Sequence, residues 1–85
     1  MNNIAFSKVL KMNGRLWEFN FRKLPGDANE YHTDFTDAKD NRIQFILFHD
    51  QRGAWQVRGS FIPTWIIDDI ALLGQAIDEF AIVPS

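Results

Sequence analysis

The chain has 85 residues, of which 46% are hydrophobic and 24% charged, a length that suits a single globular domain over residues 1–85. Because it contains no cysteine, disulfides, thiolate metal sites and thiol catalysis are excluded, and a reducing, cytoplasmic location is expected. The net charge is −2, no apolar run nears the roughly 20 residues that span a bilayer, and no basic segment precedes an apolar start, so we expect no membrane insertion and no export.

The clearest local signal is the pair Asn13-Gly14 between two segments of alternating hydrophobic residues. Both central positions of a tight type I′ hairpin turn need positive φ, which asparagine and glycine tolerate. This turn sets a register in which Met12 faces Arg15, and Lys8 is the misfit within an otherwise apolar face. The other members of that face are Ile4, Phe6, Leu10, Met12, Trp17, Phe19 and Phe21.

Two further strands are predicted after the turn at Leu24-Pro25-Gly26-Asp27. The first covers Tyr31 to Thr36, and its Tyr31 or Phe35 is expected to join the core. The second covers Arg42 to His49 and is apolar on both faces. Burial on two sides indicates a central position in the sheet, or one face that meets a partner.

The last hairpin has two alternative registers around the turn Asp50-Gln51-Arg52-Gly53, which precedes a strand from Ala54 to Arg58. A three-residue loop with Gly53 in the left-handed region places Phe45 and Leu47 on the same face as Trp55 and Val57. A four-residue loop selects Ile46 and Phe48 instead. The sequence pattern does not decide between them.

Beyond Pro63 the hydrophobic period changes from two to 3.6, which predicts a helix. Pro63 suits its first turn, Asp68 and Asp69 lie near its positive end, and Pro84 ends it at or before Val83. The stripe that would cover the sheet is Ile66, Ile70, Leu73, Ile77 and Phe80. Strands followed by one helix predict an α+β fold: an antiparallel meander of about five strands with one C-terminal α-helix packed across one face.

Few residues point to catalysis or to a metal ion. His32 and Asp34 share a strand face and His49 follows at the next turn, but structural metal sites need about four ligands, so ordinary polar strand residues are the preferred interpretation. Neither Ser7 nor Ser60 lies in a nucleophile motif, and the glycines form no phosphate-binding loop. We therefore expect a protein that is not an enzyme and that needs no metal ion or cofactor.

A second apolar strip on the predicted helix carries the leading functional hypothesis. Trp65, Leu72 and Val83 fall together about 90 to 100 degrees from the core stripe. Such a strip is typical of a protein interface anchored by a tryptophan, although a curled sheet that covers Trp65 would explain it equally. The hypothesis is a small protein-interaction module, most simply a homodimer, that self-associates through apolar sheet or helix surface.

The alternative hypothesis is binding of single-stranded nucleic acid by the exposed face of the sheet. Residues 1–26 hold five bases against one acid, a net charge of +4, whereas residues 27–85 hold four bases against ten acids, a net charge of −6. Lys11, Arg15 and Arg22 would then contact phosphates. The acidic remainder of the chain favours protein contact over nucleic acid.

Overall fold

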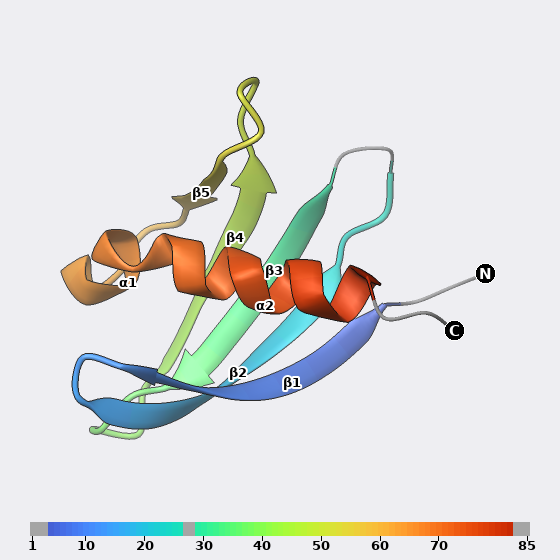
Figure 1. Ribbon diagram of the computed structural model, residues 1–85. Coiled ribbons are helices and arrows are strands. Elements are labelled where there is room, and N and C mark those ends of the chain that lie inside the picture. The colour runs from blue at the N-terminus through green and yellow to red at the C-terminus, as the bar shows by residue number, and fades with distance from the viewer. Residues whose placement is uncertain (1–3, 27–28, 83–85) are drawn as a thin grey trace.

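The computed structural model describes residues 4–26 and 29–82 and confirms the predicted α+β class (Figure 1). Five antiparallel strands form one sheet in the order in which they follow along the chain. Two helices come after them, and the second crosses one face of the sheet. The elements are β1 (Ala5–Met12), β2 (Arg15–Lys23), β3 (Glu30–Thr36), β4 (Arg42–His49), β5 (Trp55–Arg58), α1 (Thr64–Asp68) and α2 (Ile70–Ile82).

The first hairpin has the register that its turn predicts. Asn13 and Gly14 have φ values of 52° and 76°, and Met12 pairs with Arg15. Lys8 lies on the apolar side opposite Phe19, and its Nζ atom approaches Glu79 Oε1 of α2 at 3.4 Å. The charged end of Lys8 therefore stays at the edge of the sheet, where it remains hydrated.

The last hairpin adopts the three-residue alternative. Gly53 has a φ of 80°, and Leu47 pairs with Val57, so both side chains face the helices. The carboxylate of Asp50 holds the turn, because its Oδ1 atom accepts hydrogen bonds from the backbone N–H groups of Arg52 (2.8 Å) and Ala54 (3.0 Å). The bond from Ala54, followed by one from the side chain of Gln56, lowers the pKa of Asp50.

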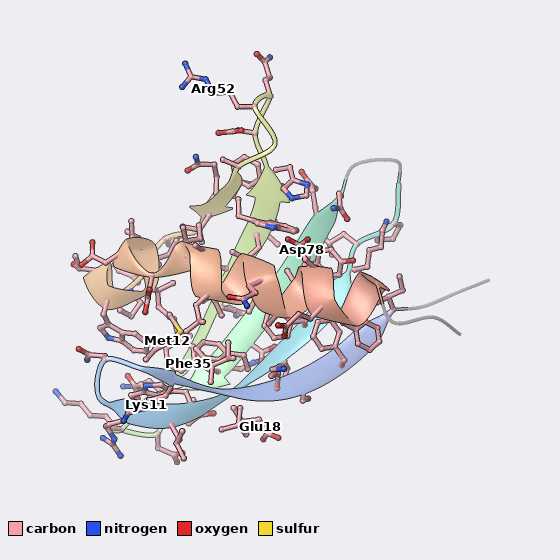
Figure 2. All side chains as sticks on the ribbon, in the orientation of Figure 1. Lys11, Met12, Glu18, Phe35, Arg52 and Asp78 are labelled. Atoms are coloured by element: carbon pink, nitrogen blue, oxygen red, sulfur yellow. The ribbon has the colours of Figure 1, made fainter. Side chains whose placement is uncertain are left out.

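The core lies between the sheet and the helices, and it contains both Tyr31 and Phe35. Figure 2 shows Met12 and Phe35 between α2 and the sheet, whereas Lys11 and Glu18 project from the opposite face. That opposite, open face is the solvated one that the hairpin pattern predicts. The buried hydrophobic residues are Met12, Trp17, Phe19, Phe21, Tyr31, Phe35, Phe45, Leu47, Ile66, Leu73, Ala76 and Ile77.

The helical segment differs from the prediction of one continuous helix, because it is interrupted at Asp69. This residue leaves helical geometry, with φ −124° and ψ 29°, and forms the C-cap of α1. Aspartate favours helix ends over helix interiors because its side chain competes for backbone hydrogen bonds. Pro63 is the N-cap rather than a first-turn residue, and Asp68 ends α1 instead of lying near its positive end.

Two residues of the predicted stripe are less buried than the pattern predicts. Ile66, Leu73 and Ile77 are buried as expected. Ile70, the first residue of α2, is only half-buried, and Phe80 is 42% exposed. Phe80 still contacts the sheet, since its ring stacks on that of Phe6 with 4.1 Å between centroids. The stripe therefore covers the sheet with three buried residues and one stacked aromatic ring.

Gly74 allows α2 to approach β5 closely. A Cβ atom at this position would overlap the indole ring of Trp55. That ring also contacts His49 at a tilt of 43°, with 3.8 Å between centroids, and its Nε1 atom donates to Asp78 Oδ2 at 3.4 Å. The close helix packing that a glycine within a helix requires is thus made to the sheet of the same chain.

Candidate functional site

The residues expected at a protein interface lie against the chain's own core. Trp65 stacks on Trp17, with 5.2 Å between ring centroids, and meets Phe35 edge-on at 5.4 Å. Leu72 is half-buried and packs against the same core, and Val83 lies outside the described residues. These contacts match the alternative reading of the strip, in which the sheet covers Trp65.

The three bases expected to contact nucleic acid lie in different places. Lys11 and Arg22 are on the open face, but Arg22 pairs with Ala5, six residues along β1 from Lys11 and therefore about 20 Å away. Arg15 lies on the helix side of the sheet, where its guanidinium sits 5.0 Å above the Trp17 ring. The three side chains do not form one continuous basic surface.

The candidate metal ligands are also separated. His32 and Asp34 lie together on the open face, with 3.7 Å between His32 Nδ1 and Asp34 Oδ2. His49 faces the helices and contacts the tilted ring of Trp55. Within residues 4–26 and 29–82, no group of three or more His, Cys, Asp or Glu side chains could hold a metal ion.

The open face carries a polar cluster centred on Asp34, which is 9% exposed. Its Oδ1 atom accepts a hydrogen bond from Asn20 Nδ2 and its Oδ2 atom accepts one from an Arg42 guanidinium nitrogen, both at 2.9 Å. Burial alone would raise the pKa of Asp34, but these two bonds and the charge of Arg42 outweigh it and lower the pKa. The cluster forms the floor of a hollow of about 380 Å³. Because both carboxylate oxygens of Asp34 are bonded to neighbouring side chains, we interpret the role of Asp34 as structural.

We expect Asp34→Asn to destabilise the fold at pH 7 and much less in acid. Because the folded-state pKa of Asp34 is lowered, its contribution is present above the unfolded-state value of about 4 and is lost as the pH falls through the folded-state pKa. Thermal melts of both proteins between pH 7 and pH 3 measure this change. The gap between their midpoints should narrow as the pH falls.

The control for this experiment is Glu18→Gln, an exposed carboxylate on the same face. Asp37 and Asp50 also have lowered pKa values, but they are common to all three proteins and cancel from the comparison. A gap between wild type and Asp34→Asn that stays constant with pH would show that Asp34 acts through packing and not through its charge.

A groove runs along the free edge of β5 and is here called the β5 groove. Two hollows of about 450 Å³ each form it, and they share Ile70. Residues 53–60 make one wall. The other wall comes from the helical segment and the turn before it: Ile62, Ile67, Ile70, Ala71, Gln75 and Asp78.

The backbone of β5 offers hydrogen-bonding groups to this groove. Asp50 donates its N–H to the carbonyl of Ala54 at 2.9 Å, so this pair is hydrogen-bonded across the hairpin. Bonded and non-bonded pairs alternate along an antiparallel ladder. Gln56 and Arg58 therefore point their backbone groups toward β4, whereas Trp55 and Val57 point theirs toward the groove.

The opposite edge of the sheet is built differently. β1 is also an edge strand, and it is twice as long as β5. However, Lys8 reaches from β1 to Glu79 of α2, so a charged side chain lies where a partner strand would enter. Lysines on an edge strand disfavour pairing with another chain. The β5 edge has an open groove beside it.

Exposed apolar side chains accompany the β5 groove. Ile67 lines it and is 51% exposed. Phe61, between two groove residues, is 88% exposed and borders a further hollow of about 570 Å³ where β4 continues past the end of β5. Exposed aromatic and aliphatic groups beside a groove are typical of binding surfaces.

The β5 groove does not follow from the sequence analysis, because its two walls come from segments whose relative position only the fold determines. The nearest signal of the groove in the sequence is Phe61, a hydrophobic residue that belongs to neither the strand pattern nor the helix pattern. Comparison with family models, with curated proteins and with solved structures finds no match in any of the three. Among the described helices, none combines the length and apolar character that a membrane span requires.

Proposed function

We propose that this chain is a small non-enzymatic protein-interaction module that binds an extended segment of another chain along the β5 groove. The observation that carries the proposal is a free strand edge beside an apolar groove. In such a site a partner strand gains main-chain hydrogen bonds from the edge, while its alternate side chains enter the groove and give specificity. The backbone N–H and C=O groups of Trp55 and Val57 form these hydrogen bonds.

The strand edge is held in place before a partner arrives. Three hydrogen bonds to the carboxylate of Asp50, from Arg52, Ala54 and Gln56, fix the turn that leads into β5. The Trp55 ring anchors the same strand against Gly74 of α2. A site ordered in advance loses less conformational entropy on binding, so a short edge strand can bind usefully.

Amide hydrogen exchange tests the proposal with a neutral peptide of alternating valine and threonine, about eight residues long to match the wall formed by residues 53–60. In the free protein the N–H groups of Trp55 and Val57 should exchange quickly, and millimolar peptide should slow them. The N–H groups of Gln56 and Arg58, already bonded to β4, are internal controls. Slowed exchange confined to β1 would contradict the proposal, as would no change at Trp55 and Val57.

Two matched variants show whether the exposed aromatic residue takes part. Phe61→Asp should keep the melting midpoint, since the ring is almost fully exposed, but should weaken peptide binding. Leu16→Asp introduces the same charge at a residue that is 70% exposed on the open face, and it should leave binding unchanged. Equal effects of the two variants would remove Phe61 from the site.

If the segment bound in the β5 groove comes from a second copy of this chain, the protein self-associates. Light scattering across protein concentrations measures this self-association directly. The absence of cysteine supports a reducing, cytoplasmic setting for the module.

A further inference from the structure

We infer that the segment bound in the β5 groove is a basic one, with lysine or arginine alternating with aliphatic residues, from a partner protein. This inference rests on the proposed function and adds the chemistry of the partner. It follows from the charges around the groove.

All the charged residues of the helical segment are acidic, and one of them, Asp78, lines the groove. Residues 64–82 contain Asp68, Asp69, Asp78 and Glu79 and no basic residue. Glu79 is paired with Lys8, but among the described residues no basic side chain pairs with the other three. Asp78 lines the groove, and its charge, second to burial, raises the pKa of Tyr31 in the core beneath. A cationic side chain entering here would meet the carboxylate of Asp78, with which no basic side chain of the described residues pairs.

The strand wall does not supply the missing positive charge. Its basic residue next to the groove is Arg58, which contacts Glu30 Oε2 at 3.1 Å and lies 5.2 Å above the Phe48 ring. The charge of Arg58 is therefore directed to the open face of the sheet. The apolar floor provided by Ile67 and Ile70 suits the methylene stems of the cationic side chains.

A second copy of this chain fits the groove less well. A twofold contact between two β5 edges would bring the acidic helical segments together, and like charges in contact are unfavourable. The basic strand β1 of a copy has the right charge, but its Phe6 is already stacked between Phe21 and Phe80 of its own core. The Phe6 ring of such a strand is therefore not available to the groove of another molecule.

The experiment compares three peptides of about eight residues that differ only in the residue alternating with valine: lysine, threonine or glutamate. Binding is followed at low salt by the amide shifts and exchange of Trp55 and Val57. We expect the lysine peptide to bind about tenfold more tightly than the threonine peptide, and the glutamate peptide more weakly than both. Salt should reduce these differences. Asp78→Asn, which keeps an acceptor for Trp55, should reduce the preference for lysine, whereas Glu18→Gln on the open face should not.

Each result has a definite meaning. If the three peptides bind equally at Trp55 and Val57, the groove binds strands but the inference of a basic partner is wrong. If none of them affects these amides at millimolar concentration, the proposed function fails as well. If the mass of the protein doubles without peptide and the amides of Trp55 and Val57 become protected, a second copy occupies the groove and the inferred partner is overturned.

Discussion

Replacing Leu73 by alanine should lower the free energy of unfolding by about 2 to 5 kcal/mol. Leu73 is fully buried near the middle of α2, so the substitution leaves a cavity between the helix and the sheet. A domain of this size has a total stability of only about 5 to 15 kcal/mol, and each kcal/mol corresponds to roughly 4 to 8 °C in the melting midpoint. Urea unfolding measures the loss, and the slope of the transition shows whether the native state stays compact.

Two comparisons make this result specific to packing. Leu73→Met nearly conserves side-chain volume and should cost less than about 1.5 kcal/mol. Leu16→Ala removes the same atoms from an exposed position and should change stability by less than about 0.5 kcal/mol. If Leu73→Ala lowered the stability no more than Leu16→Ala, the result would contradict the burial of Leu73 between α2 and the sheet.

The second large effect is expected from Gly74→Ala, a substitution that normally stabilises a helix by about 1 kcal/mol. Here the added methyl group would overlap the Trp55 ring, which cannot move without losing its contacts with His49 and Asp78. Overpacking of this kind costs about 1 to 3 kcal/mol. We therefore expect a net loss on the order of 1 to 2 kcal/mol in urea or thermal unfolding.

A double-mutant cycle separates the clash from helix propensity. In a Trp55→Leu background the ring is absent, so Gly74→Ala should become neutral or stabilising. Ala71→Gly, at an exposed position of the same helix, provides the propensity term alone and should cost about 1 kcal/mol. A higher melting midpoint for Gly74→Ala in the wild-type background would contradict the close contact with Trp55.

The strands and their faces could be predicted because local rules determine them. Asn13-Gly14 supports one tight turn, and a strand period of two then assigns every neighbouring side chain to a face. The same rules left the last hairpin undecided, since Gly53 is compatible with either loop length. The choice depends on which side chains the helices cover, namely Phe45 and Leu47 rather than Ile46 and Phe48.

The helix interruption and the β5 groove could not be predicted, for related reasons. A continuous 3.6-residue pattern runs through Asp69, so periodicity alone does not reveal the break there. The strip at Trp65 and Leu72 has the pattern of an interface, but the twist of the sheet brings Trp17 and Phe35 into contact with Trp65. The exposed groove instead lies beside β5, where strand and helix meet only after folding.

The order of the elements along the chain has a consequence for synthesis on the ribosome. The sheet, which carries the aromatic face, precedes the helix that covers it, so roughly one to five seconds of translation separate the end of β5 from the end of α2. Hairpins form in microseconds, and each strand of this sheet pairs with its neighbour in the chain. Phe19, Phe21 and Phe35 therefore remain uncovered on the nascent chain for far longer than the strands need to pair, and chaperones can bind them during that interval.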